Sequence, residues 1–121
     1  MIKVAIVEDN TALRQSLEQL FSKTEGMQCV ASLSNLLNVL SELQRSAPDI
    51  VLMDIGLPSI SGIEGVRTVK SNFENIQVLM FTVFEDDEKI FDAIRAGASG
   101  YLLKKTPPEE IVQAVRELHE G

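Results

Sequence analysis

The sequence predicts an α/β fold: a doubly wound, five-stranded parallel sheet with helices on both faces. The first observation is a strict alternation of short apolar runs with longer segments whose apolar residues recur at helical spacing. Such alternation is typical of parallel sheets joined by right-handed crossovers. The second observation is the run Ile50–Met53, in which polar and apolar residues do not alternate. A continuous apolar run indicates a strand buried on both faces, as in the middle of a parallel sheet.

Three strands and two helices are predicted in the first half of the chain. The strands cover Ile2–Val7, Gln28–Leu33 and Ile50–Met53. The first helix closes near Gly26, and its apolar face contains Leu13, Leu17, Leu20 and Phe21. The second helix ends before Pro48, and its apolar positions are Leu36, Leu40 and Leu43.

The third and fourth helices are predicted from their first turns. The segment Ser61-Gly62-Ile63-Glu64 has the pattern of a capping box, and the apolar face that follows is Ile63, Val66 and Val69. A strand over Ile76–Phe81 comes next. The acidic run Asp86-Asp87-Glu88 suits the positive end of a helix dipole. That helix is predicted to stop at Gly97, with Ile90, Phe91 and Ile94 as its apolar face.

The last strand and helix complete five strand–helix units. The strand covers Gly100–Leu103. Thr106 is the predicted cap of the helix, followed by proline in the first turn and Glu109 as the capping-box glutamate. Its buried face is expected to be Ile111, Val112, Val115 and Leu118. Five such units favour the flavodoxin-like strand order 2-1-3-4-5. No G-x-G-x-x-G pattern follows the first strand, which argues against dinucleotide binding.

Composition restricts the classes of function. The 121 residues suggest one domain, and a net charge of −7 makes binding to nucleic acid or anionic membrane by this domain unfavourable. A single cysteine, Cys29, excludes an internal disulfide. No apolar run approaches the roughly 20 residues of a membrane span. Carboxylates at Glu8 and Asp9 come too early for a signal peptide, so a cytoplasmic protein is expected.

Polar residues follow the strands at the edge where ligands bind in open α/β sheets. Glu8 and Asp9 follow the first strand, Asp54 the third, Thr82 the fourth and Lys104 the fifth. In the order 2-1-3 the first and third strands are neighbours, so three carboxylates should converge. Like charges at such proximity repel and require a cation, and hard oxygen ligands suit Mg²⁺. Lys104 would supply a second positive charge.

The turn after Asp54 is predicted from two further residues. Gly56 should let the backbone turn sharply, and Pro58 should prevent a return to strand. Asp, Gly and Pro are also ordinary turn residues, so this segment alone does not distinguish a functional aspartate from the start of a turn.

Together these residues resemble the receiver domain of two-component response regulators. The acidic pair Glu8-Asp9, Asp54 with Pro58 and Gly62 behind it, Thr82 and Lys104 occur in that family's order and spacing, over essentially the whole chain. The segments Thr82–Asp87 and Ala96–Lys104 are most similar to the NarL/FixJ (LuxR-type) branch. Residues 1–121 are then a single receiver domain. The DNA-binding output domain of that branch would lie after residue 121 and is absent from these residues.

The resemblance implies a mechanism and a set of roles. Asp54 would accept a phosphoryl group from a phosphohistidine of a sensor histidine kinase, in a Mg²⁺-dependent reaction. Asp9, Asp54 and the backbone carbonyl of Gly56 would hold Mg²⁺, with Glu8 binding it through water. Thr82 and Lys104 would contact the phosphoryl oxygens.

It also implies an output. Thr82 and Tyr101 would form a switch that alters the surface of the fourth helix, fifth strand and fifth helix. A homodimer on phosphorylation would form through this surface or through the surface of the first and fifth helices, which some NarL/FixJ-type receivers use. Control of transcription would follow, with DNA reached only through the absent output domain. Such a domain is not a conventional enzyme, although it catalyses its own phosphorylation and dephosphorylation.

Two other classes of function stay open. A Mg²⁺-dependent phosphohydrolase of the haloacid dehalogenase type would pair its nucleophile with an Asp two residues later, where this chain has Gly56. A stand-alone interaction module with a receiver fold and no phosphorylation would be expected to lack Asp54, Lys104 or the acidic pair, and all are present.

Overall fold

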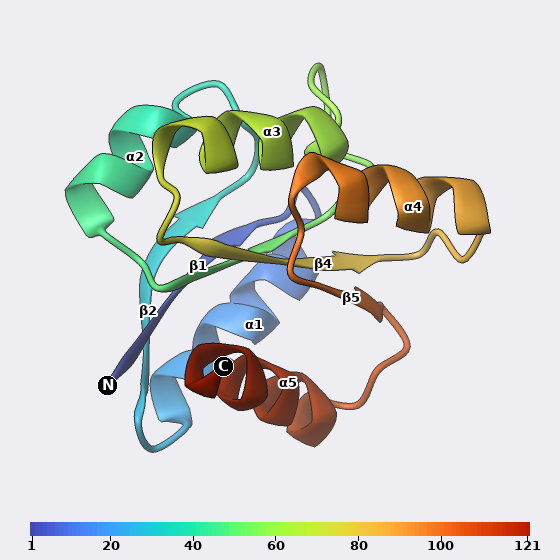
Figure 1. The fold of residues 1–121 in the computed structure, drawn as a ribbon. Coiled ribbons are helices and arrows are strands. Elements are labelled where there is room, and N and C mark those ends of the chain that lie inside the picture. The colour runs from blue at the N-terminus through green and yellow to red at the C-terminus, as the bar shows by residue number, and fades with distance from the viewer.

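The computed structural model describes residues 1–121 as five strands that alternate with five helices (Figure 1). The strands are β1 (Ile2–Val7), β2 (Met27–Leu33), β3 (Ile50–Met53), β4 (Gln77–Thr82) and β5 (Gly100–Leu103). The helices are α1 (Thr11–Lys23), α2 (Val39–Ser46), α3 (Gly62–Asn72), α4 (Asp87–Ala96) and α5 (Pro108–Glu120). All neighbouring strands are parallel, in the order β2-β1-β3-β4-β5, which confirms the predicted fold class.

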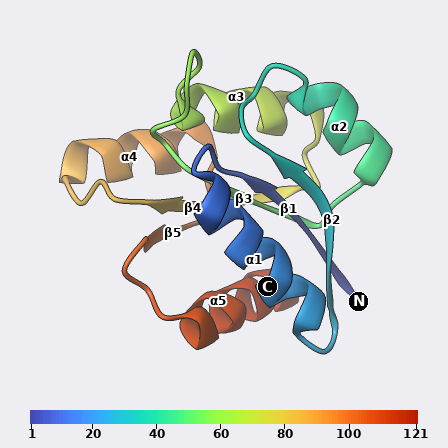
Figure 2. The same cartoon turned by 180° about the vertical axis from the view of Figure 1, so that it is seen from behind.

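The sheet separates two hydrophobic cores. Helices α2, α3 and α4 cover one face and α1 and α5 the other, as the two opposite views show (Figures 1 and 2). Successive residues of β3 enter opposite cores: Val51 and Met53 pack under α2 and α3, whereas Ile50 and Leu52 pack against α1 and α5. All four are at most 1% exposed, so the predicted burial of this strand on both faces is confirmed. No helix combines the length and apolar character that a bilayer span requires.

Helix starts agree with the predictions only in part. Ser61 caps α3 by accepting a hydrogen bond from the Ile63 backbone N–H. Glu64 does not complete the capping box, because its carboxylate pairs with Arg67 one turn later. The predicted Thr106 cap of α5 is wrong: the N-cap is Pro107, which has no side chain able to accept a hydrogen bond.

The apolar faces of α2 and α4 also differ from the predictions. Leu36 is buried but precedes α2, and Leu40 is 38% exposed. In α4 the only fully buried residue is Ala93, whereas Phe91 is 65% and Ile94 48% exposed. Residues three apart share a helix face, so Phe91 and Ile94 form a stripe next to the one that contains Ala93. The predicted burial of Phe91 and Ile94 is therefore wrong, because the stripe with the small side chain packs against the sheet.

Candidate functional site

The register of the sheet brings the predicted site residues to one edge. Val7 of β1 lies opposite Met53 of β3, and the Asp54 backbone N–H donates to the Val7 carbonyl across 3.3 Å. Glu8 and Asp54, which follow these strands, are therefore neighbours. Asp9 joins them: one carboxylate oxygen from each of Glu8, Asp9 and Asp54 lies within 4.8 Å of the other two. The predicted convergence of three carboxylates is present in the structure.

Lys104 is the cation of this edge. Leu103 is paired with Thr82, and the Lys104 ammonium donates to Asp54 Oδ2 at 2.8 Å and pairs with Glu8 Oε1 at 2.9 Å. Burial alone would lower the pKa of Lys104. Hydrogen bonds and charge attraction from Asp54 and Glu8 outweigh burial and raise the pKa of Lys104 above its ordinary value. Lys104 therefore stays protonated and neutralises part of the acidic cluster.

The two members of the acidic pair differ in environment. Glu8 is 2% exposed, and its second carboxylate oxygen accepts a 2.9 Å hydrogen bond from the Asn10 backbone N–H. The Arg14 guanidinium donates to the Glu8 carbonyl across 2.8 Å. Asp9 is exposed, and its carboxylate accepts no hydrogen bond from the protein. Sequence reasoning missed Arg14, which carries no signal beyond being a basic residue in the first turn of α1.

The oxygen atoms at this edge fit a small hard cation. Carboxylates from three residues converge, and the Gly56 carbonyl on the adjoining loop accepts no backbone hydrogen bond. Mg²⁺ prefers oxygen ligands and usually takes one or two carboxylates while keeping several waters. The free Asp9 carboxylate and the free Gly56 carbonyl are donors of that kind.

Thr82 presents an unpaired polar atom. The residue is fully buried at the end of β4, and its hydroxyl has no hydrogen-bond partner. Buried hydroxyl groups are nearly always paired, and an unpaired one requires a specific explanation. A ligand oxygen bound at this edge would supply the missing partner.

The loop between β3 and α3 depends on Gly62 more than on Gly56. A Cβ at position 62 would overlap the carbonyl oxygen of Asp54 and lie 2.8 Å from Ile55 Cα. A Cβ at position 56 would meet only ordinary contact, 3.5 Å from the Phe84 ring. The backbone bends at Gly56, as predicted, but the left-handed residue of this loop is Ser59, with φ 69°.

Phe84 connects three parts of the site. Its ring lies beside Gly56, and the Lys89 ammonium is 5.2 Å from the ring centroid. Its carbonyl accepts a 2.8 Å hydrogen bond from the Tyr101 hydroxyl. Burial, followed by the charges of Asp86 and Asp54, raises the pKa of Tyr101 above 10.0. Tyr101 on β5 is thus joined to the loop that also contacts the Asp54 turn.

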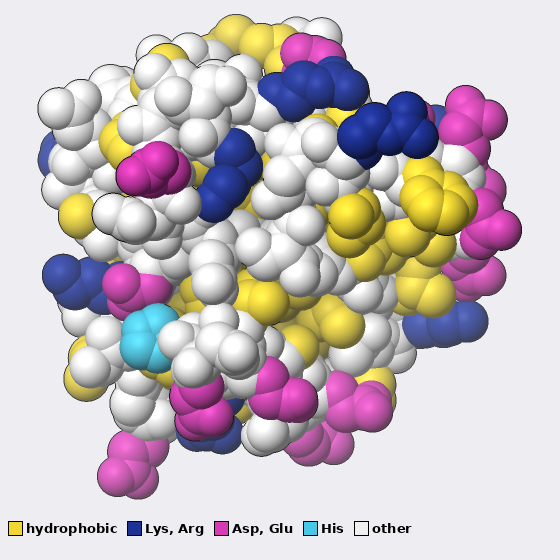
Figure 3. All heavy atoms as spheres, in the orientation of Figure 1, with side chains coloured by type: hydrophobic (Ala, Val, Ile, Leu, Met, Phe, Trp, Pro, Cys, Tyr) yellow, Lys and Arg dark blue, Asp and Glu magenta, His cyan; other side chains and the backbone are white.

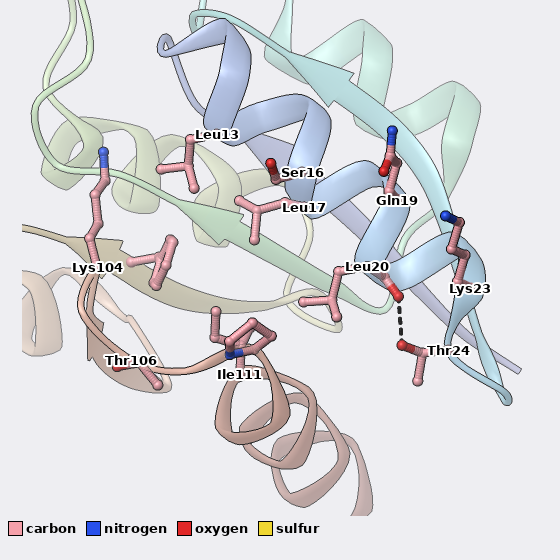
Figure 4. Close-up of a pocket in the computed structure, with 12 residues that line it drawn as sticks. Leu13, Ser16, Leu17, Gln19, Leu20, Lys23, Thr24, Lys104, Thr106 and Ile111 are labelled. Carbon is pink, nitrogen blue, oxygen red and sulfur yellow. Dashed lines mark hydrogen bonds between the residues drawn. The ribbon is translucent and has the colours of Figure 1, made fainter.

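A cleft of about 540 Å³ lies between α1 and α5, and Lys104 stands between this cleft and the acidic cluster (Figure 4). Its walls are mainly apolar and include Leu13, Leu17 and Ile111. The stem of Lys104 lines one end, while its ammonium group points away toward Asp54 and Glu8.

Comparisons with known proteins point to one family. A model of the response regulator receiver domain matches residues 4–116. The transcriptional regulatory protein LnrK of Bacillus subtilis (strain 168) is 38% identical over 121 residues, which are 100% of this chain and 55% of LnrK. The response regulator GacA of Pseudomonas aeruginosa is 35% identical over 121 residues, again 100% of this chain and 56% of GacA. The chain thus spans about half the length of these curated relatives.

A solved structure supports the same comparison. A LuxR-family two-component response regulator from Aurantimonas sp. SI85-9A1 superposes with a TM-score of 0.92 and 30% sequence identity. The match covers 98% of this chain and 85% of that chain.

Proposed function

We propose that this chain, which belongs to the response regulator receiver domain family, accepts a phosphoryl group on Asp54 from a phosphohistidine of a sensor histidine kinase. An Asp54 oxygen attacks phosphorus, the N–P bond breaks, and its electron pair stays on the imidazole, which takes up a proton. The later attack of water on phosphorus restores the carboxylate and releases inorganic phosphate. The family predicted from the sequence is confirmed, and LuxR-family response regulators are among its relatives. The domain is not a conventional enzyme.

The observation that carries this proposal is the set of groups around the Asp54 carboxylate. Lys104 already contacts Asp54 and would neutralise charge on a phosphoryl oxygen. The unpaired Thr82 hydroxyl would donate to a second phosphoryl oxygen. Phosphoryl transfer needs mainly positioning and charge neutralisation, which these two side chains would supply.

Mg²⁺ completes the proposed site. Asp9, Asp54 and the Gly56 carbonyl would hold the ion directly, and Glu8 would hold it through water. When bound, the ion offsets negative charge on the phosphoryl oxygens. Both oxygens of Glu8 already have protein partners, namely Lys104 and the Asn10 backbone, which favours an outer role for Glu8.

The proposed output is a change of surface. Thr82 would move toward the phosphoryl group, and Tyr101 would transmit that movement through its hydrogen bond to the Phe84 carbonyl. The surface affected is that of α4, β5 and α5, where hydrophobic side chains gather (Figure 3). Phe91 and Ile94 of α4 are exposed apolar residues of this surface, and Val83 lies in the loop that precedes α4. A second phosphorylated copy is the proposed partner there.

Control of transcription is the proposed consequence, supported by the names of relatives such as LnrK. DNA would be reached through an output domain outside residues 1–121. A kinase that presents its phosphohistidine to this domain implies a cytoplasmic location.

Labelling by acetyl phosphate tests the proposal against its alternatives. With Mg²⁺, the protein should gain the mass of one phosphoryl group, and Asp54→Asn should gain none. Asp49→Asn is the matched control, since Asp49 lies at the opposite end of β3. No labelling of the wild type would favour a stand-alone interaction module. Continuous turnover of a small phosphate ester would favour a phosphohydrolase.

A further inference from the structure

Arg14 occupies a helix position at which a positively charged side chain is not expected. It is the fourth residue of α1, near the positive end of the helix dipole, where a cation is unfavourable. It forms no ion pair with any carboxylate. Its side-chain hydrogen bond goes instead from Nη1 to the Glu8 carbonyl, across 2.8 Å. The guanidinium group is thus unfavourable at this end of the helix, and no carboxylate pairs with it there. A role for Arg14 in the tertiary structure would explain its presence.

The Glu8 carbonyl belongs to the peptide unit that places Asp9. A peptide unit is planar, so fixing the carbonyl oxygen of Glu8 also fixes the plane that carries the Asp9 nitrogen and Cα. The rest of Glu8 is held as well: its backbone N–H donates to Leu33, and its carboxylate is bound by Lys104 and the Asn10 backbone. Asp9 has no such restraint on its own carboxylate. Its orientation toward Asp54 therefore depends on the peptide unit that Arg14 holds.

We infer that Arg14 is a positioning residue for Mg²⁺: through the Glu8 carbonyl it orients the Asp9 carboxylate toward Asp54. This inference rests on the magnesium site of the proposed function. Groups that orient metal ligands typically change metal affinity by 10- to 100-fold when they are removed.

A purely electrostatic role gives the opposite expectation. A guanidinium group near a cation site repels the cation, so its removal would strengthen Mg²⁺ binding. If Arg14 positions Asp9, its removal weakens Mg²⁺ binding even though a positive charge is lost. The sign of the change in affinity therefore separates the two roles.

Isothermal titration calorimetry with MgCl₂ measures this sign directly. Arg14→Met keeps an unbranched apolar stem and the helix propensity, removes the guanidinium donor, and should weaken Mg²⁺ binding by about tenfold. Arg14→Lys, which keeps a charged donor, should recover most of the lost affinity. Arg67→Met is the matched control: it removes the same charge from an exposed residue of α3 and should leave Mg²⁺ affinity unchanged.

The outcomes separate this inference from the proposal on which it rests. Equal or tighter binding by Arg14→Met would overturn the positioning role while leaving the magnesium site intact. Absence of Mg²⁺ binding by the wild type would overturn the magnesium site, and the inference with it. Circular dichroism shows whether Arg14→Met is folded. If it is not, Arg14→Gln gives the same test, because glutamine is too short to reach the Glu8 carbonyl.

Discussion

Lys104 and Asp54, which are 50 positions apart in the sequence, are joined by a 2.8 Å hydrogen bond between ammonium and carboxylate. Lys104 also pairs with Glu8, and the side chains of both acidic partners are at most 7% exposed. One ammonium group therefore compensates two buried carboxylates. Removing one partner of a buried ion pair leaves uncompensated charge and is strongly destabilising.

Lys104→Met should lower the free energy of unfolding by about 3 kcal/mol in a metal chelator. The loss of stability should shrink with Mg²⁺, because the ion replaces the missing positive charge.

The raised pKa of Lys104 predicts a pH dependence as well. The stabilisation of the fold by Lys104 is complete below pH 10.5 and is lost as the pH rises through the folded-state pKa. Urea denaturation at neutral and alkaline pH measures both effects. Lys105→Met removes an exposed ion pair with Glu85 and should change little.

Mg²⁺ should raise the melting temperature without any phosphate present. The ion would bind only the folded arrangement of Glu8, Asp9 and Asp54, so it stabilises that state by mass action. Asp9→Asn should blunt the response, and loss of one like charge should raise the melting temperature in a chelator. Scanning calorimetry at several Mg²⁺ concentrations checks this. A full metal response in Asp9→Asn would contradict the ligand role of Asp9.

Gly62→Ala should be far more damaging than Gly56→Ala. The new methyl group at position 62 would overlap the Asp54 carbonyl, whereas at position 56 it would meet only ordinary contact. Overpacking typically costs about 1–3 kcal/mol, and here the displaced backbone carries Asp54, the proposed phosphoacceptor. Chemical denaturation and labelling by acetyl phosphate should both be impaired in Gly62→Ala. Equal behaviour of the two variants would show that the loop adapts.

Tyr101 can be followed by its own absorbance, because the chain has one tyrosine and no tryptophan. Ultraviolet titration should give an ionisation midpoint above 10.0, since burial and the charges of Asp86 and Asp54 disfavour the phenolate. Asp86→Asn should move the midpoint down, while Asp92→Asn, within the helix that Asp86 caps, should not. Because the folded state holds this proton more tightly, stability should fall as the pH rises above 10.0.

Beryllofluoride, which stands in for the phosphoryl group on Asp54, should increase self-association through the exposed apolar stripe of α4. Light scattering should detect a larger particle than the free protein, and amide NMR shifts should extend from Asp54 to Tyr101 and α4. Phe91→Ser should prevent association while leaving the shifts near Asp54. The matched control is Leu37→Ser, an equally exposed apolar residue near α2. Shifts confined to the Asp54 pocket, with no change in mass, would rule out a switch in this domain.

The fold class and much of the site followed from local patterns. Strand runs such as Ile50–Met53 need only their own apolar residues to indicate burial on both faces, and the alternation of elements restricts the topology. Parallel strands end at one edge, so residues after them, such as Asp54 and Lys104, were expected to meet. The patterns failed where two helix faces or two glycines were equally compatible with the local sequence. Helix periodicity does not distinguish the Phe91 stripe from the Ala93 stripe, and composition does not show which glycine lies against the Asp54 carbonyl.

The sequence by itself therefore determined the strands, their parallel arrangement and the residues at their carboxyl ends, because these depend on neighbours in the chain. Tertiary structure alone decided that Glu8 is bound by Lys104 and Arg14 while Asp9 is left free. It also decided that the Thr82 hydroxyl is buried without a partner. Such contacts depend on strand register and side-chain direction, and a hydrogen bond weakens steeply when its geometry departs from the optimum. No pattern along the chain carries that information.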